Sequence, residues 1–202
     1  MKIICIGRNY VEHAKEIGLG EPTEPLLFMK PSTAIHRPTQ DYYIPEWTQD
    51  LQHEVEVVLK ICKNGKHIRP EFAHKYFEEF TVGIDFTARD IQRKLMKEGH
   101  PWERSKSFDN SAVIGEFKKV ADYDIANLQY SLHKNGELLQ DGNANAMVFN
   151  FAQIIAEASK FFTLQQGDYL FCGSPSGVSA VAIGDILDVS IEKEKLFTLN
   201  IK

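Results

Sequence analysis

The sequence has few cysteines, and their arrangement suggests neither a cross-link nor a zinc knuckle. Cys5, Cys62 and Cys172 are isolated from one another and lie in apolar or strand-like surroundings. An odd number of cysteines without close spacing argues against a disulfide framework and against a zinc site. We expect these side chains to be small buried hydrophobic groups in a protein of a reducing compartment.

Long apolar runs and blocks of one charge are also missing. The first apolar stretch ends at Ile6, which is too short for the core of a signal peptide, and no stretch approaches the length that crosses a bilayer. The net charge of −5 is spread along the chain, so nothing favours a nucleic acid or an anionic membrane as a partner. These absences predict a cytoplasmic protein.

The composition that is present is that of an ordinary globular protein. The 202 residues, of which 43% are apolar and 25% charged, suit one domain spanning 1–202. Patterns of short strands outnumber patterns of helices, which predicts an α+β fold. Strands are expected at 2–6, 26–29, 51–61, 80–88, 128–132, 137–139, 169–172, 178–181, 186–191 and 196–201.

Helices and turns follow from capping and turn residues. Asn64-Gly65 and Asn135-Gly136 predict hairpin turns. Residues 31–50 contain three prolines and little periodicity, so we expect an irregular excursion with an edge strand at 42–44. Helices are expected at 9–17 before Gly18, at 70–80, from a capping box of Thr87 and Asp90 to Gly99, and at 151–162.

The predicted strand at 51–61 carries two acidic residues on one face. Glu54 and Glu56 are two positions apart, so their side chains point the same way, about 7 Å from each other. That spacing allows two carboxylates to share a cation. A face of glutamine, glutamate and lysine is more often that of an ordinary solvated strand, and two carboxylates alone are a weak metal motif.

Asp85 offers a third carboxylate. It stands at the end of a mostly apolar strand, just before a strand-to-helix turn. The alternative is a turn acid or a carboxylate satisfied by backbone amides, although an apolar strand is a costly place for an unpaired charge. Three carboxylates without clustered cysteine or histidine favour an oxygen-preferring cation, so we expect one Mg²⁺ or Mn²⁺ per chain rather than Zn²⁺.

His13 and Glu16 are three residues apart on the first predicted helix, so their side chains are neighbours. From spacing alone, an ordinary surface contact is the favoured interpretation of this pair.

Seven short segments, spread over nearly the whole chain, carry recognisable motifs. They are GRNYVEH (7–13), PLLFMKPS (25–32), HEVE (53–56), DFTARDIQ (85–92), PW with SKSF (101–102 and 105–108), QDG (140–142) and GSPSGV (173–178). Each is weakly specific, but in this order they resemble the fumarylacetoacetate hydrolase superfamily. The likeness is strongest to its short single-domain branch, which includes acylpyruvate hydrolases and oxaloacetate decarboxylases. The resemblance implies a mixed β-sheet roll or sandwich with a few flanking helices, and a homodimer.

The same resemblance implies a role for each matching residue. One departure is that the family's Gly-Thr-Pro loop here begins Gly173-Ser174, which keeps the hydroxyl and loses a methyl group. By the resemblance, the metal ligands are Glu54, Glu56 and Asp85; the catalytic residues are Lys106 and a dyad of His13 and Glu16 on a helix that closes over the substrate; and the substrate-binding residues are Arg89, Gln92, Gly173 and Ser174.

The implied activity is that of a divalent-metal-dependent hydrolase. A 2-oxo acid chelates a hard cation, and breaking the C3–C4 bond of an acylpyruvate-like β-diketo acid releases a metal-bound pyruvate enolate. Oxaloacetate would give the same enolate by decarboxylation. The alternatives are an isomerase, decarboxylase or hydratase of aromatic or sugar-acid catabolism in the same superfamily, and a non-catalytic carboxylate-binding protein.

Overall fold

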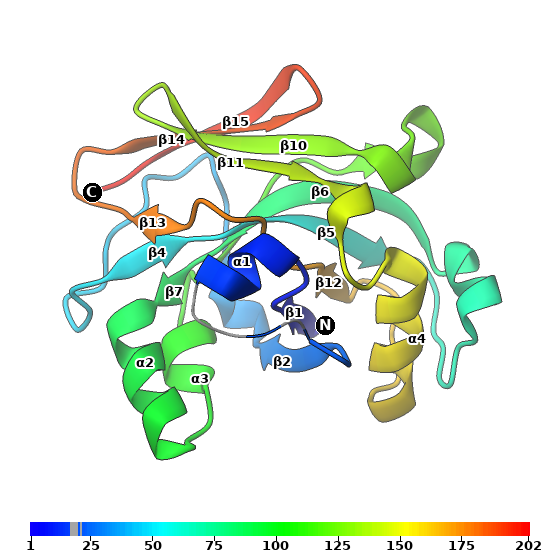
Figure 1. Ribbon diagram of the computed structural model, residues 1–202. Helices are drawn as coiled ribbons and strands as arrows, with labels where there is room; N and C mark the ends of the chain where they lie inside the picture. The colour runs from blue at the N-terminus through cyan, green and yellow to red at the C-terminus, as the bar shows by residue number, and fades with distance from the viewer. Residues whose placement is uncertain (17–19, 21) are drawn as a thin grey trace.

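The computed structural model describes residues 1–16, 20 and 22–202. It shows an α+β protein of short strands and a few helices (Figure 1). The strands and α-helices are β1 (Ile3–Gly7), α1 (Val11–Glu16), β2 (Leu26–Lys30), β3 (Ile35–His36), β4 (Leu51–His53), β5 (Val55–Ile61), β6 (Phe77–Asp85), β7 (Thr87–Ala88), α2 (Arg89–Glu98), α3 (Glu103–Lys106), β8 (Ala112–Ile114), β9 (Lys118–Lys119), β10 (Gln129–Lys134), β11 (Glu137–Asn143), α4 (Phe151–Phe161), β12 (Tyr169–Phe171), β13 (Ser179–Ala180), β14 (Ile186–Ile191) and β15 (Glu194–Asn200). Short 3₁₀ helices lie at Ser32–Ala34, Pro70–Lys75, Val120–Asp122, Ile125–Asn127 and Ala144–Ala146.

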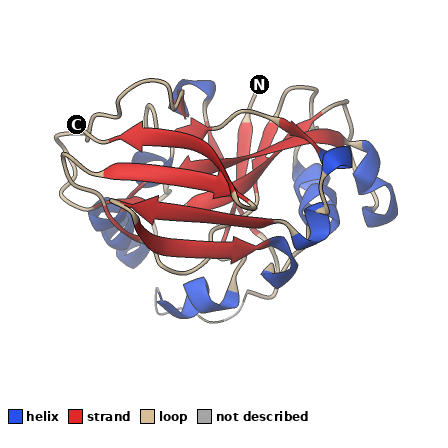
Figure 2. Ribbon diagram, turned by 90° about the horizontal axis from the view of Figure 1, so that it is seen from above, coloured by secondary structure: helices blue, strands red, loops and turns tan. Residues whose placement is uncertain are grey.

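The strands form two main sheets and a small one. The largest sheet has the order β2-β1-β12-β5-β6-β8-β3, with β9 pairing with β6 beside this path. Its β1–β12 and β3–β8 pairs are parallel, and its other pairs are antiparallel. A four-stranded antiparallel sheet, β11-β10-β14-β15, lies above it in Figure 1 and faces the viewer in Figure 2. The third sheet has the order β13-β4-β7.

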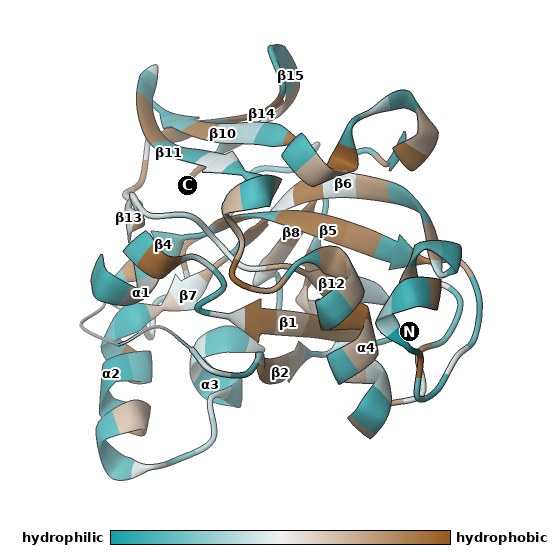
Figure 3. Ribbon diagram, turned by 45° about the vertical axis from the view of Figure 1, so that its right-hand side comes forward, coloured by the Kyte–Doolittle hydropathy of each residue, from teal (hydrophilic) through white to brown (hydrophobic). Residues whose placement is uncertain are grey.

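Both faces of β5 are buried, so the glutamate on this strand, Glu56, lies in the interior of the protein. Val57 belongs to the main core cluster, which also contains Leu132 and Val189 of the four-stranded sheet. Val58 points to the opposite face and packs in a second cluster with Ile3 and other residues of the large sheet. Figure 3 shows β1 and much of β5 in the colour of hydrophobic residues. A polar side chain on β5 therefore needs a partner inside the protein.

Most of the expected elements are present near their expected bounds. The hairpin of β10 and β11 turns at Asn135 and Gly136, whose φ angles of 54° and 85° are those that a type I′ turn requires. The helix α4 begins with a capping box, in which Asn150 and Gln153 each bind the other's backbone amide. The predicted end of the first helix at Gly18 lies outside the described residues.

The predictions around residues 62–80 are wrong. The Asn64-Gly65 pair does not form a tight hairpin, since residues 62–76 separate β5 from β6 and Gly65 pairs instead with Leu164. The helix predicted at 70–80 is only the 3₁₀ helix Pro70–Lys75. Strand β6 begins at Phe77, and Phe77 and Phe80 fill the core from this strand.

Two boundaries near the predicted metal ligands also differ. Thr87 is a residue of the two-residue strand β7, and the N-cap of α2 is Ala88, without a side-chain cap. Asp90 instead accepts hydrogen bonds from Thr48 Oγ1 (2.7 Å) and Gln49 N (2.9 Å). The strand predicted at 51–61 is interrupted at Glu54, because β4 pairs with β7 and β13 whereas β5 pairs with β6 and β12.

Two predictions about irregular segments are also wrong. The edge strand expected at 42–44 is reduced to one bridge between Tyr42 and Ile201. Residues 102–115 show no helix or strand pattern in the sequence, which predicts a loop, but the segment around Lys106 forms the short helix α3. Among the described residues no helix has the length and apolar character needed to span a membrane.

Candidate metal centre and active site

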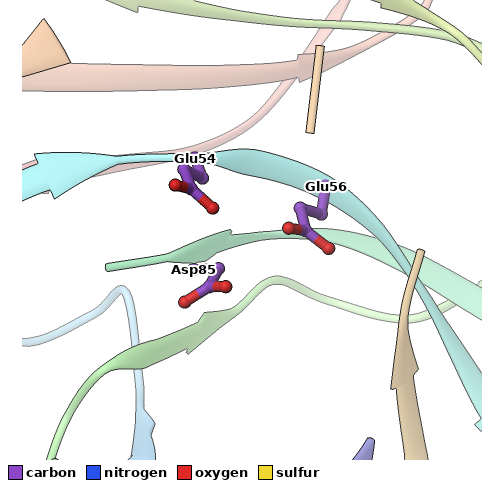
Figure 4. A group of neighbouring side chains, drawn as sticks. All are labelled: Glu54, Glu56 and Asp85. Carbon is purple, nitrogen blue, oxygen red and sulfur yellow. The ribbon is translucent and has the colours of Figure 1, made fainter. Parts of the chain in front are cut away.

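The three predicted carboxylates meet where β5 and β6 pair. Glu54 sits in the break before β5, Glu56 lies on β5, and Asp85 ends β6. The backbone brings them together, since Val55 is opposite Ile84 and the amide of Asp85 donates to the carbonyl oxygen of Glu54 at 2.8 Å. Each carboxylate places an oxygen within 4.8 Å of the other two, and all three are buried (Figure 4). The solvated-strand interpretation of this face is therefore wrong.

Three buried cations surround this cluster. Lys106, the last residue of α3, places its Nζ 2.7 Å from Glu54 Oε2 and 2.8 Å from Asp85 Oδ2. The guanidinium of Arg89, from the first turn of α2, forms an ion pair with Glu54 Oε1. On the other side, Lys30 Nζ lies 2.7 Å from Asp85 Oδ1. Three carboxylates thus face three cationic side chains, and all six side chains are buried.

The charges shift the pKa values in opposite directions. Burial alone would raise the pKa of Glu54, but the adjacent Lys106 and Arg89 bring it well below its ordinary value. Burial, together with the charges of Asp85 and Glu54, raises the pKa of Glu56. Burial would lower the pKa of Lys106, but its two carboxylate partners raise that pKa, so it remains an ammonium at neutral pH.

The donor set fits a hard divalent cation. Carboxylate oxygens are the ligands that Mg²⁺ and Mn²⁺ prefer. Asp85 Oδ1 receives no hydrogen bond of acceptable geometry from any described residue, although the Lys30 ammonium is nearby. Lys30 directs its hydrogens to Ser111 and to the backbone oxygen of Lys106 instead. A buried carboxylate oxygen with unused lone pairs is available to a cation.

The predicted dyad lies on α1. His13 Nδ1 is 3.3 Å from Glu16 Oε2, and His13 is buried although Glu16 is partly exposed. The carboxylate of Glu16 also accepts a hydrogen bond from Gly177 N at 3.2 Å. The pair is thus linked to the loop 173–177, and the burial of His13 is not that of an ordinary surface contact.

The loop 173–177 approaches the carboxylates through its backbone. Gly173 N donates to Glu56 Oε2 at 2.7 Å. Gly173 has a φ of 97°, and a Cβ there would lie 2.5 Å from the Cβ of Asn9, so only glycine fits. Ser174, the next residue, is buried.

A cleft of about 410 Å³ has walls from α1, α2, β4 and the segment before β13; they are formed by Glu16, Gln52, Arg89, Gln92, Arg93, Met96 and Val178. Arg89 donates from Nη1 to Gln92 Oε1 and from Nε to Gln52 Oε1, so these side chains hold one another in place. A larger hollow of about 630 Å³ lies beside α4, and none of the predicted site residues lines it. The chemistry therefore points to the smaller cleft.

The structure brings all ten predicted site residues into one connected region, and it adds three that the sequence interpretation did not assign. Lys30, His53 and Gln140 all lie in the quoted motifs but carried no role there. The sequence did carry a signal for Lys30: it ends the apolar run of β2, so it is expected to be buried, and a buried lysine needs a partner. Burial lowers the pKa of His53 to about 4, so its ring is neutral at pH 7.

The chain is similar to known proteins over most of its length. The chain is 39% identical over 199 residues to the oxaloacetate tautomerase YcgM of Escherichia coli, covering 98% of this chain and 91% of that protein. It is 37% identical over 190 residues to the mitochondrial oxaloacetate tautomerase of Bos taurus, covering 94% and 86%.

Solved structures are similar over the whole chain. The fumarylpyruvate hydrolase of Pseudomonas aeruginosa, in complex with Mn²⁺ and pyruvate, has a TM-score of 0.94 and 32% identity and is covered over 89% of its length. A fumarylacetoacetate hydrolase family protein of Yersinia pestis has a TM-score of 0.96 and 35% identity and is covered over 93%. Residues 2–200 match the family described as fumarylacetoacetate (FAA) hydrolase C-terminal, and the chain belongs to that family.

Proposed function

We propose that this protein is a divalent-cation-dependent enzyme that forms the enolate of a 2-oxo acid, and that its reaction is the keto–enol interconversion of oxaloacetate. The observation that carries the proposal is the buried cluster of Glu54, Glu56 and Asp85 with the Lys106 ammonium in contact with it. The names of the two oxaloacetate tautomerases support the choice of substrate.

Charge in the buried cluster favours a dianion. Three carboxylates are balanced by the cations of Lys30, Lys106 and Arg89. A bound divalent cation adds two positive charges, which a substrate with two carboxylates offsets. Oxaloacetate is such a dianion, and an acylpyruvate with an uncharged acyl group is not. Because uncompensated charge in a buried site is costly, dicarboxylates should be preferred.

The residues of the chain supply the proton transfer and the oxyanion contact. Glu54, Glu56 and Asp85 would hold the cation, which supplies positive charge to the 2-oxo and carboxylate oxygens of the substrate. Lys106 donates a hydrogen bond to the oxygen that becomes negative. His13, oriented by Glu16, takes the proton from C3 as a general base and delivers it to the C2 oxygen, which completes the enol; the reverse transfer restores the keto form. Arg89 and Gln92 bind the distal carboxylate in the cleft.

A second candidate is hydrolysis of the C3–C4 bond of acylpyruvates. The fumarylpyruvate hydrolase of Pseudomonas aeruginosa, with its bound pyruvate, supports this reaction. His13 would then deprotonate a water that attacks the C4 carbonyl, and Lys106 would stabilise the pyruvate enolate that leaves. Decarboxylation of oxaloacetate yields the same enolate without an attacking water.

The test is to assay the three reactions side by side with Mg²⁺ and with Mn²⁺. We expect loss of the enol's ultraviolet absorbance to be accelerated, chelator to abolish the rate, and His13→Ala to lower kcat for tautomerisation by roughly 10²–10⁴-fold. Lys15→Ala is the matched control on α1, because Lys15 is exposed and its ammonium pairs with the exposed Glu12. Release of pyruvate from acylpyruvates without tautomerisation would favour the second candidate, and full activity in chelator would contradict both.

We further propose that the protein is a homodimer, as the family resemblance implies. Sedimentation equilibrium at micromolar concentration should give twice the mass of 23.0 kDa. A stable monomer would contradict this proposal.

A further inference from the structure

Gln140 of β11 is fully buried and lies directly behind the loop that carries Ser174. Its side-chain amide meets four groups. At the oxygen end, Oε1 lies 3.0 Å from Val55 N and 2.9 Å from His53 Nδ1. At the nitrogen end, Nε2 lies 2.8 Å from Ser174 Oγ and 2.9 Å from Pro175 O.

Two of these neighbours fix the orientation of the amide independently. The backbone N–H of Val55 only donates, so the atom that faces it must be the oxygen of the amide. The carbonyl oxygen of Pro175 only accepts, so the atom that faces it must be the nitrogen. A flipped amide would place a donor against a donor and an acceptor against an acceptor. The hydrogen bond between Gln140 and Ser174 therefore has one direction, from Nε2 to Oγ.

This direction decides what the Ser174 hydroxyl can do. Its oxygen accepts from Gln140, so its own hydrogen is left to find an acceptor. Pro175 O is 3.4 Å away and already receives the stronger bond from Gln140. Resting on the proposed function, in which the Gly173–Ser174 loop binds a substrate oxygen, we propose that Gln140 is a positioning residue that makes Ser174 a hydrogen-bond donor to a carboxylate or keto oxygen.

The network behind Gln140 points the same way. The Nδ1 of His53 faces the amide oxygen of Gln140 and therefore carries a hydrogen. The other ring nitrogen of His53 lies 2.9 Å from Ser179 Oγ, which Lys134 Nζ approaches to 3.2 Å. Each link donates toward the next, from Lys134 at the surface to Ser174. His53 holds Gln140, and Gln140 holds Ser174.

Position in the site explains why one hydroxyl matters. Gly173 N is engaged by Glu56, one of the proposed cation ligands, so Ser174 is adjacent to the backbone that contacts the cation site. A ligand that bound both the cation and Ser174 would need more than one acceptor oxygen, which a 2-oxo acid has. Oxalate, a planar dianion with the same pattern of oxygens, is a suitable probe.

The experiment is a double-mutant cycle on oxalate binding. Titration calorimetry with the Mn²⁺-loaded protein compares wild type, Gln140→Met, Ser174→Ala and the double variant. We expect each single change to weaken oxalate binding about tenfold or more, as loss of a hydrogen bond to a charged acceptor does. In the Ser174→Ala background, Gln140→Met should add less than about a twofold loss, because a positioning residue has nothing left to position.

Two further measurements separate this role from a merely structural one. Mn²⁺ affinity without oxalate should stay within about twofold in all four proteins, since none of the changes removes a carboxylate. Gln140→Glu is the second variant, in case the methionine variant does not fold. Its carboxylate accepts the Ser174 hydrogen, so the same loss and the same pattern of non-additivity are expected.

Additive losses in the cycle, or an unchanged oxalate affinity in both Gln140 variants, would overturn the positioning role. A wild-type protein that binds Mn²⁺ but neither oxalate nor pyruvate would instead overturn the proposed function, and with it the inference that rests on it.

Discussion

Replacing Lys106 by methionine should reduce stability sharply in the absence of a divalent cation. The ammonium lies 2.7 and 2.8 Å from two buried carboxylates. At an effective dielectric constant of about 20, each contact is a gross attraction of about 6 kcal/mol. Several kcal/mol of this offset the cost of burying the ammonium itself. Removing the Lys106 ammonium leaves the charges of its two carboxylate partners uncompensated, so the free energy of unfolding should fall by about 3–5 kcal/mol.

The assay is urea unfolding followed by tryptophan fluorescence, once with chelator and once with saturating Mn²⁺. In chelator, the unfolding free energy of Lys106→Met should lie about 3–5 kcal/mol below that of wild type. With Mn²⁺ the gap should shrink, because a dication beside Glu54 and Asp85 replaces the positive charge that the lysine supplied. The variant should therefore gain more stability from Mn²⁺ than wild type does.

Lys60→Met is the matched control. Lys60 Nζ lies 2.6 Å from Glu79 Oε2, as close as the buried pair, but both side chains are more than one-third exposed. An exposed pair contributes about 0–1 kcal/mol, and Mn²⁺ should not change that value. If Lys106→Met and Lys60→Met lose equally little stability in chelator, the charge balance assigned to the buried cluster is wrong.

Two further predictions concern Gly177 and His53. Gly177→Ala should destabilise the protein by at least about 1–2 kcal/mol and raise KM. Gly177 has a φ of 94°, a Cβ there would lie 1.8 Å from Leu139 O, and the Gly177 amide donates a hydrogen bond to Glu16. Thermal unfolding and steady-state kinetics check this, and a variant with unchanged KM would show that the loop tolerates the shift. The pKa of His53 is about 4 in the folded chain and about 6.5 in the unfolded chain, so the unfolded chain binds the proton first and stability falls as the pH drops from 6.5 to 4. This 2.5-unit difference corresponds to about 3 kcal/mol of unfolding free energy. Between pH 6.5 and 4, wild type should therefore lose about that much more stability than His53→Asn. Parallel curves of unfolding free energy against pH for the two proteins would contradict the lowered pKa of His53.

The sequence predicted the identity of the carboxylate cluster better than its surroundings. Alternation along 51–61 correctly placed Glu54 and Glu56 on one side, since side-chain direction in a strand is a local property. Whether that side meets water depends on what covers it. Strand β5 lies between β6 and β12 with cores on both faces, and pairing between distant segments decides this.

The errors have the same origin. Asn64-Gly65 is a strong local turn signal, but Gly65 pairs with Leu164, which lies 99 residues further along the chain. The local sequence predicted that Thr87 caps a helix, but Thr87 pairs with Gln52 and belongs to a strand. Lys30 and Gln140 were missed because a single polar residue in an apolar strand reveals its partner only in the folded chain. Local chemistry can be read from the sequence, and long-range partners cannot.

The position of β1 inside the large sheet has a consequence for how the chain folds. Ile3 pairs with Tyr169, so the first strand of the chain keeps one unpaired edge until residues 169–171 are available. Strand β5 also keeps one unpaired edge until the same segment is available, because β12 lies between β1 and β5 in the sheet. Ordering such a long loop before its contacts form is slow, so docking of β12 should limit the folding rate. A ribosome-bound chain would expose two apolar strand edges until almost all of it has emerged, and such edges are where unfinished chains aggregate.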